Sequence, residues 1–255
     1  MKPYPKITFT FFLLLVVCTI ANAQKLPNVQ QTSLRAPAGI KIDGKATEWG
    51  NQFQAYNHAT DVNYTLSNDD ANLYLTVQAT IPDVIKKILN GGITLTISQT
   101  GKKSDKGASG ISYPVSAPGN KVSIYLRNKP TGSIADSLMN VKNKEMSTKY
   151  KTIRTSGIAQ LDTLISVYNT ENIKAAERFD NNLYYNYELA VPLKYLGITA
   201  DSATFAYHIK INEVQQSGIA IKKDAQRRIL SVSVTPNSVM GQPATDFWAE
   251  YTLAK

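Results

Sequence analysis

Cysteine is nearly absent from this sequence, since Cys18 is the only one among 255 residues. It lies in an N-terminal stretch that we expect to be removed, so the remaining chain holds no thiol. Disulfide bonds, thiolate zinc sites, iron–sulfur clusters and cysteine nucleophiles are therefore excluded from that chain. A lipoprotein signal would instead lipidate Cys18, although the residue before it, Val17, is larger than such signals accept.

Recognisable catalytic motifs are also lacking. The sequence has no Gly-x-Ser-x-Gly elbow, no His-Glu-x-x-His pair and no Gly-x-x-x-x-Gly-Lys-Ser/Thr loop. A glycosidase needs two carboxylates about 5 to 10 Å apart. Sequence alone pairs no two of the candidate acids, which are Glu48, Glu177, Glu188, Glu213 and Glu250. The sequence therefore favours a binding protein over an enzyme.

The N-terminal segment has the three parts of a secretory signal peptide. Lys2 and Lys6 precede an apolar run over residues 7–20, and an Ala-Asn-Ala cleavage pattern follows it. The run is shorter than the roughly 20 residues that cross a bilayer as a helix. We therefore expect a signal peptide over residues 1–23 and export to the periplasm or the cell exterior, with no transmembrane segment left after cleavage.

Basic residues outnumber acidic ones, 28 to 19. Removing Lys2 and Lys6 leaves 26 basic and 19 acidic side chains, a net charge of 26 − 19 = +7. Such a surface favours anionic envelope polysaccharides or lipid headgroups as partners, or is simply solvated. No nucleic-acid partner is expected, because no binding motif for one is recognisable. One basic group either contacts phosphate or uronate groups or forms a solvated loop: Lys222, Lys223, Arg227 and Arg228.

Alternation of apolar and polar residues dominates the chain after residue 36. Residues 62–66 and 73–79 alternate on either side of a turn-forming stretch, which predicts a hairpin with one face exposed to water. The same period of two returns in four later segments, at residues 93–97, 205–211, 230–234 and 247–253. Many short strands with polar outer faces predict a mainly β protein, namely an antiparallel β-sandwich of two sheets.

Helices are the minority in this pattern. Residues 82–90 are predicted to form a helix, with a proline suited to the first turn and a glycine placed to end it. Residues 133–149 carry a weaker apolar stripe and are either a second helix or an extended loop. We expect three regions after the signal peptide: an irregular leader over residues 24–35, a single domain over residues 36–255, and an insertion in that domain near residues 99–150.

Three segments in order along the chain resemble one group of proteins. Residues 40–49, from Ile40 to Trp49, resemble the "I-x-I-D-G-x-x-x-E-W" opening of the family 9 carbohydrate-binding modules and the related DOMON-like β-sandwiches. Residues 67–79 resemble the acidic turn and alternating strand of that group, and residues 187–197 resemble its strand that enters an "I-P-x-x-x-L-G" turn. The resemblance implies a β-sandwich that binds sugars without catalysis, through aromatic rings that lie flat against pyranose faces.

The last alternating segment supplies the main candidate for a sugar platform. Phe247 and Leu253 belong to its apolar series, so Trp248 falls with Glu250 on the polar face. An indole beside a carboxylate offers a flat apolar surface with a hydrogen-bonding group next to it. We expect a polysaccharide or oligosaccharide to stack on Trp248 and to bond Glu250. In the alternative, a loop covers the indole.

Tyrosines form a second group of candidate ligand-binding residues. Tyr184 and Tyr185 stand just before the strand predicted around Glu188, with Tyr187 close behind them. Their amphipathic rings suit a binding surface, but tyrosine is also a favoured strand former with one wet edge, and this favours the cluster as scaffold. Trp49 is interpreted as structural, because it follows the turn in the segment that resembles the family opening.

No cofactor is expected. Asp69, Asp70 and Asn72 offer oxygen ligands to calcium, but a hairpin turn explains the same run. Haem occurs in some DOMON-like proteins and needs axial ligands, yet no spacing singles out a pair among His58, His208, Met139, Met146 and Met240. Both histidines are interpreted as surface residues. The rival functions are an envelope structural or interaction protein without a small-molecule site, and a haem-binding carrier.

Overall fold

The computed structural model describes residues 25–50, 52–116, 120–126, 129–199, 204–224, 226 and 228–255, without the side chains of residues 215–223 and 230–240. The predicted signal peptide lies outside these ranges, as do Arg227 and the side chains of Lys222, Lys223 and Met240. Within the described residues, none of the helices has the length and apolar character that crossing a membrane requires.

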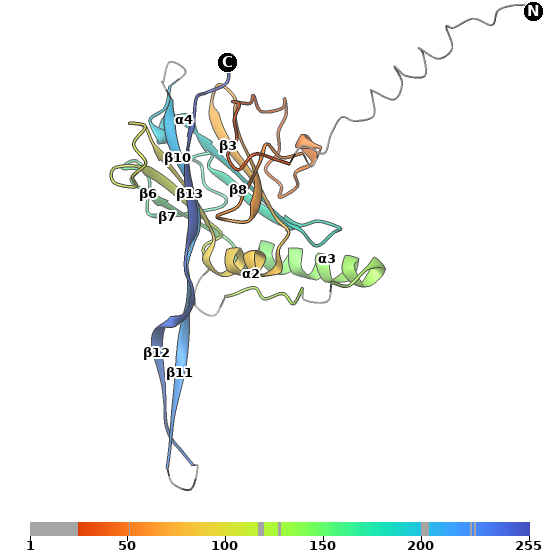
Figure 1. The fold of residues 1–255 in the computed structure, drawn as a ribbon, viewed down its shortest axis with the longest axis vertical. Helices are drawn as coiled ribbons and strands as arrows, with labels where there is room; N and C mark the ends of the chain where they lie inside the picture. The colour runs from red at the N-terminus through yellow and green to blue at the C-terminus, as the bar shows by residue number, and fades with distance from the viewer. Residues whose placement is uncertain are drawn as a thin grey trace, which may run out of the picture.

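Two antiparallel sheets pack against each other, which confirms the predicted β-sandwich (Figure 1). The first sheet has five strands in the order β1-β2-β3-β9-β8, namely β1 (Ala55–Asn57), β2 (Val62–Asn68), β3 (Asn72–Ala79), β9 (Tyr185–Pro192) and β8 (Lys174–Phe179). The second has six in the order β13-β10-β4-β5-β6-β7, namely β13 (Thr245–Tyr251), β10 (Phe205–Ile211), β4 (Ile93–Ser98), β5 (Ser109–Tyr113), β6 (Thr152–Ser156) and β7 (Leu164–Ser166).

Helices lie at the margins of the sandwich, and both predicted helical segments are helical. The described helices are η1 (Thr47–Trp49), α2 (Pro82–Gly91), α3 (Gly132–Lys149) and the single turn α4 (Leu193–Leu196). In α2, Pro82 occupies the first turn, Ile85 and Ile88 are buried, and the Gly92 amide donates to the Ile88 carbonyl at the end. In α3, Ala135 and Met146 face the core.

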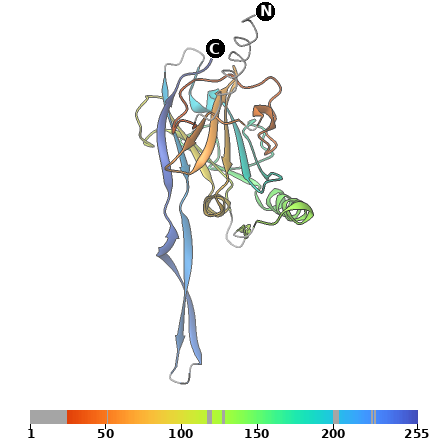
Figure 2. The same cartoon turned by 45° about the vertical axis from the view of Figure 1, so that its right-hand side comes forward.

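A separate two-stranded hairpin leaves the sandwich. It is formed by β11 (Val214–Lys223) and β12 (Ile229–Gln242), which pair antiparallel. Since β11 follows β10 and β12 precedes β13, the hairpin continues two neighbouring strands of the second sheet. Figures 1 and 2 show it extending well beyond the body of the molecule.

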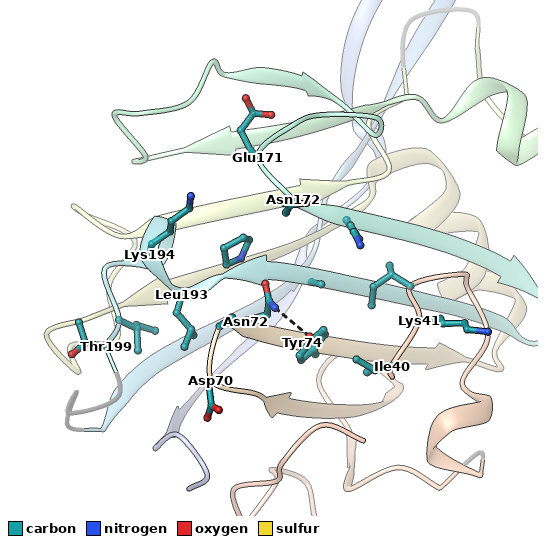
Figure 3. A pocket seen from close by; sticks show the side chains of 16 residues that line it. Ile40, Lys41, Asp70, Asn72, Tyr74, Glu171, Asn172, Leu193, Lys194 and Thr199 are labelled. Atoms are coloured by element: carbon teal, nitrogen blue, oxygen red, sulfur yellow. Dashed lines mark hydrogen bonds between the residues drawn. The ribbon is translucent and has the colours of Figure 1, made fainter. Parts of the chain in front are cut away.

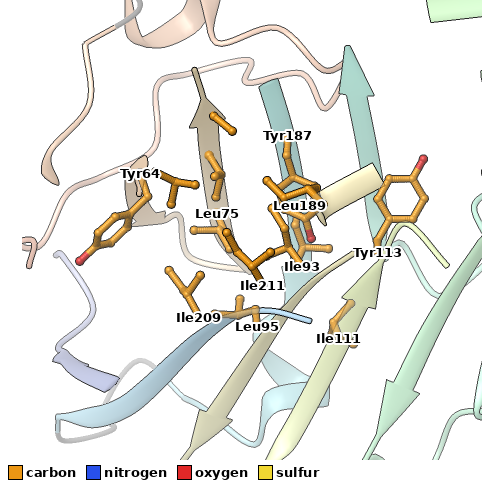
Figure 4. Packing of buried hydrophobic residues seen from close by; sticks show 14 of the residues in the cluster. Tyr64, Leu75, Ile93, Leu95, Ile111, Tyr113, Tyr187, Leu189, Ile209 and Ile211 are labelled. Atoms are coloured by element: carbon orange, nitrogen blue, oxygen red, sulfur yellow. The ribbon is translucent and has the colours of Figure 1, made fainter. Parts of the chain in front are cut away.

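The core lies between the two sheets. Alternate residues of each strand meet there, for example Leu75 from the first sheet and Leu95 and Ile209 from the second, each almost fully buried (Figure 4). This parity agrees with the alternation in the sequence, since successive strand residues point to opposite faces. Tyrosines share the core with aliphatic residues, and Tyr64 and Tyr187 have no exposed surface.

The prediction that the β2–β3 hairpin has a wet face is wrong. Thr65 on β2 and Thr76 on β3 belong to the face away from the core, and both are buried. The residues ahead of η1 cover this face, with Gly44 bonded to Glu188 on the neighbouring strand β9. Alternation tells which residues share a face, but it does not tell whether a distant segment packs on that face.

The leader over residues 24–35 is irregular in its described part, as predicted, but it is packed against β2. Gln30 is buried, and its side-chain amide both donates to and accepts from the backbone of Leu66, at 2.7 and 2.8 Å. The leader is therefore part of the folded body. The region predicted as an insertion near residues 99–150 contributes β5 to the second sheet as well as α3.

Removing the Tyr64 hydroxyl tests the attachment of the leader. This hydroxyl accepts from the backbone N–H of Gln30 and bonds the Tyr207 hydroxyl, both at 2.9 Å and both buried. Tyr64→Phe should lower the free energy of unfolding by about 2 kcal/mol, because two buried polar groups lose a partner. Urea unfolding measures this loss. The exposed Tyr125→Phe serves as control, and equal midpoints for the two variants would contradict the expectation.

Candidate functional site

Trp248 lies on the edge strand β13, on the face away from the core. Trp248 is partly exposed and Glu250 is exposed, whereas the alternate residues of the strand are buried, namely Phe247, Ala249 and Tyr251. The predicted alternation of this strand is therefore confirmed. The indole stacks on the imidazole of His208 in the neighbouring strand, with ring centroids 4.3 Å apart and planes 12° apart. His208 thus covers one face of the indole and fixes its orientation.

His208 is not the surface residue that the sequence suggested. It is only 4% exposed, because Trp248 stacks on it and the loop before β5 folds over it. Its Nδ1 lies 3.0 Å from Oδ1 of Asp105 in that loop, and its Nε2 lies 3.3 Å from Oδ1 of Asp246 on β13. A ring with both nitrogens turned toward carboxylates holds the loop onto the sheet.

The register of the second sheet arranges its outer side chains in two rows across the strands. One row carries Trp248, His208, Thr96, Gly110 and Ser156. The neighbouring row carries Asp246, Lys210, Thr94, Ser112 and Arg154. Within the second row the Thr94 hydroxyl bonds Ser112 at 2.7 Å and Asn212 at 2.8 Å. Hydroxyl, amide and charged groups therefore line this outer face.

A groove of about 1070 Å³ runs over these rows. Its lining includes Thr94, Thr96, Ser112, Arg154, Ser156 and Lys210. Asp105 from the loop held by His208 forms part of the wall. The volume is slightly above the usual range of ligand sites, about 300 to 1,000 Å³, and the lining is polar rather than apolar. Trp248 is not part of the lining, but it lies in the same row, one strand beyond His208 and two strands beyond Thr96.

The other predicted site residues do not join Trp248. Glu250 is exposed and its Oε1 lies 3.6 Å from Nζ of Lys103 in the loop before β5. Tyr184 precedes β9 in the first sheet, with Nζ of Lys129 4.6 Å from its ring centroid. Tyr185 has no exposed surface, so its ring cannot stack on a sugar. The prediction is wrong for Tyr185, because its strand position faces the core.

The acidic turn at residues 69–72 is satisfied by protein groups. Oδ1 of Asp69 accepts from the amides of Ala71 and Asn72, and Oδ2 accepts from the Tyr74 hydroxyl at 2.6 Å. Burial acts to raise the pKa of Asp69, but these hydrogen bonds outweigh it and hold the pKa below its ordinary value. Asp70 pairs with Arg35 at 2.8 Å. This arrangement supports the hairpin-turn interpretation of the run.

A second concavity, of about 860 Å³, lies on the outer side of the first sheet (Figure 3). Its lining mixes Asp70, Glu171, Lys174 and Lys194 with apolar residues. Tyr74 is only 6% exposed there, and burial together with its hydrogen bond to Asp69 raises its pKa to about 12. The ring of Tyr74 is thus too buried for a ligand to stack on it, and the concavity has no row of hydroxyl groups like that of the second sheet. The groove on the second sheet is therefore the better candidate site.

Several groove residues were missed from the sequence. Thr94, Thr96 and Lys210 alternate with apolar residues in recognised strands, so the signal for them was present. Arg154 and Ser156 belong to the short strand β6, whose apolar positions are too few to predict a strand. Its pairing with β5 brings Arg154 opposite Ser112, 42 residues earlier in the chain.

Comparison with known proteins adds no relative. No family model matches the sequence, and no curated protein matches it either. What the fold and the groove define is a class, namely an antiparallel β-sandwich with a polar groove on the outer face of one sheet.

Proposed function

We propose that this protein is an exported, non-catalytic carbohydrate-binding protein that resembles family 9 carbohydrate-binding modules. The observation that carries the proposal is the groove of about 1070 Å³ lined by threonine, serine, arginine and lysine side chains. Sugars present many hydroxyl groups that both donate and accept hydrogen bonds. A lining rich in small hydroxyl and charged groups matches them better than it matches an apolar ligand.

The ligand would lie across the strands rather than along one of them. From Trp248 on β13 to Ser156 on β6 the row spans four strand spacings of about 4.8 Å, or about 19 Å. This length suits an oligosaccharide or a polysaccharide segment. Hydroxyl groups would bond the groove residues, and one sugar ring at the end would stack on the indole of Trp248, which His208 holds in place.

Titration against a panel of neutral and acidic glycans tests the proposal. For a glycan that binds, Arg154→Ala and Trp248→Ala should each weaken the affinity about tenfold, through a lost charged hydrogen bond and a lost stacking surface. Tyr168→Ala is the matched control, since Tyr168 is an exposed aromatic residue outside the groove lining. Failure of the whole panel, or equal affinities in all three variants, would refute the proposal.

The β11–β12 hairpin favours a second candidate, a structural or interaction protein of the cell envelope. Its strands pair with each other and extend away from the sandwich (Figure 2), as an arm that reaches a partner would. Replacing residues 216–241 with a short turn separates the two candidates. Under the carbohydrate proposal the shortened protein keeps its glycan affinity. Under the second candidate the intact protein binds no glycan, and the arm is needed for retention on envelope fractions.

A further inference from the structure

A carboxyl group lies inside the sandwich, at the end nearest α3. Glu177 occupies an inward position of β8, between Ala175 and Phe179, and its Cα partner is Tyr187 of β9. The Tyr187 ring in turn lies 6.2 Å from the ring of Tyr113 on β5 (Figure 4). Glu177 as a whole is half-buried and its carboxyl faces the Tyr113 hydroxyl, but Oε2 is sealed from solvent without a partner, which is unusual for a carboxylate oxygen.

Three polar atoms around this carboxyl lack hydrogen-bond partners among the described residues. They are Oε2 of Glu177 and the hydroxyl oxygens of Tyr185 and Tyr187, all buried. The neighbouring Tyr150 differs, because its hydroxyl donates to the Leu89 carbonyl at 2.6 Å. The large majority of buried side-chain polar atoms in proteins have a hydrogen-bond partner. Unpartnered atoms on two adjacent strands therefore point to polar atoms that enter from outside the chain.

A cleft of about 450 Å³ between α3 and β8 leads to this carboxyl. Glu177, Tyr113 and Tyr150 contribute to its lining, and α3 adds Asn140 and Ser147. The volume lies within the range of small-molecule sites, and it exceeds what one or two buried waters occupy. The cleft and the groove on the second sheet share no lining residue. Ligand binding in the cleft therefore does not depend on the function proposed above.

The charges of the cleft favour an anionic ligand. Lys144 on α3, Lys151 after it and Arg178 on β8 are part of the lining. The other acidic residue of the lining, Asp43, already pairs with Lys45 at 3.2 Å. Burial raises the pKa of Glu177 to about 8, against the smaller opposing effects of Tyr113 and Lys151. The carboxyl is therefore neutral at pH 7, able to donate and accept hydrogen bonds without repelling an anion.

We propose that this cleft is a binding site for a single sugar acid, a hexuronate, whose carboxylate meets Lys144 and Arg178 and whose hydroxyl groups reach Glu177 and the tyrosines behind it. The unpartnered Oε2 of Glu177 takes up a ligand hydroxyl, while the hydroxyls of Tyr185 and Tyr187, which are not part of the lining, connect to the ligand only through a bridging water. A neutral hexose of the same size would keep these contacts but lose the ionic ones.

Calorimetric titration of the full protein with glucuronate, galacturonate and glucose tests the proposal. At pH 6.5 a hexuronate should bind at least tenfold more tightly than glucose. Lys144→Ala should weaken hexuronate binding about tenfold. Lys142→Ala is the matched control, because Lys142 lies on the same helix, pairs with Glu145 at 2.7 Å and is not part of the cleft lining. Lys144 is exposed, so its replacement leaves the core intact.

The pH dependence supplies a second readout. Ionisation of Glu177 above pH 8 places a negative charge beside the ligand, so hexuronate affinity should fall several-fold between pH 6.5 and 9. In Glu177→Gln this fall should disappear. The titratable and charged groups that line the cleft or face Glu177 are Asp43, Tyr113, Lys144, Tyr150, Lys151, Arg178, Tyr185 and Tyr187, and Glu145 on α3 acts on Tyr150 from behind the lining.

Two outcomes would overturn the proposal. The first is no binding of either hexuronate at millimolar concentration, which would leave only waters in the cleft. The second is binding that neither Lys144→Ala nor Glu177→Gln alters. Because Trp248→Ala and Arg154→Ala report on the groove alone, failure of the cleft site and failure of the groove site are told apart.

Discussion

Replacing Gly44 with alanine is expected to destabilise the protein by about 3 kcal/mol or more. Gly44 has a φ of 79°, in the left-handed region that alanine adopts only with strain. A Cβ at this position would also stand 2.6 Å from the backbone carbon of Glu177 and 2.9 Å from the backbone nitrogen of Arg178. Backbone of β8 cannot move aside without disturbing its pairing with β9, so strain and overpacking add together.

Gly39 supplies a matched control for this substitution. Its φ is 75°, nearly the same as that of Gly44, but a Cβ built there meets no atom within 4 Å. Gly39→Ala should therefore lose only about 1 kcal/mol, from the backbone conformation alone. Urea unfolding of the two variants separates the steric part from the conformational part. Equal losses would show that the turn at Gly44 is not pressed against β8.

The fold should also lose about 3 kcal/mol of stability as pH rises, through Glu188. This residue is fully buried on the outer side of β9, beneath the turn at Gly44. Its Oε2 accepts from the amides of Asp43 and Gly44 at 3.0 and 2.9 Å, while Oε1 has no partner among the described residues. Burial raises its pKa from 4.5 to about 7, and the two amide hydrogen bonds only partly oppose the shift.

The direction of the effect follows from proton binding. Between pH 4.5 and 7 the folded protein holds a proton on Glu188 that the unfolded chain has released. The contribution to stability is thus fully present below pH 4.5 and is lost as pH rises through about 7. The difference between a pKa of 4.5 and one of about 7 corresponds to about 3 kcal/mol. Glu177, whose pKa is raised to about 8 by burial, acts in the same direction.

Unfolding by urea at pH 5, 6, 7, 8 and 9 measures this contribution. Glu188→Gln should remove the part that belongs to Glu188, so its free energy of unfolding should vary less with pH than that of the wild type. Glu250→Gln removes an exposed carboxylate and should leave the pH dependence unchanged. A wild-type protein that gains stability from pH 5 to pH 8, or an unaltered profile in Glu188→Gln, would contradict the expectation.

Much of the sandwich could be predicted from the sequence, because period-two alternation reports strand position directly. The hairpin of β2 and β3, the outward position of Trp248 and helix α2 all follow from local patterns. Alternation does not report what covers a face. For that reason the outer residues of β2 and β3, and His208 on β10, are buried although their neighbours in sequence suggested exposure.

The binding groove and the cleft were harder to predict, because they depend on pairing between distant strands. Ser112 and Arg154 meet only through the register of β5 and β6. Glu177 faces the core from β8, whose sequence Lys-Ala-Ala-Glu-Arg-Phe shows no apolar alternation that would have revealed its inward position. Tyr185 was a candidate binding residue with scaffold as the alternative, and the sequence could not decide between them, since tyrosine occurs both in cores and on surfaces; its burial supports the scaffold interpretation.

The two ends of the described chain are fastened to each other. The Ser33 hydroxyl donates to the Thr252 carbonyl, and Arg35 and Asn68 both donate to the Ala254 carbonyl. This junction lies at the pole of the sandwich opposite the β11–β12 hairpin (Figure 1). A tether joined ahead of the leader or behind residue 255 would therefore hold the molecule in much the same orientation, with the arm directed away from the anchoring surface.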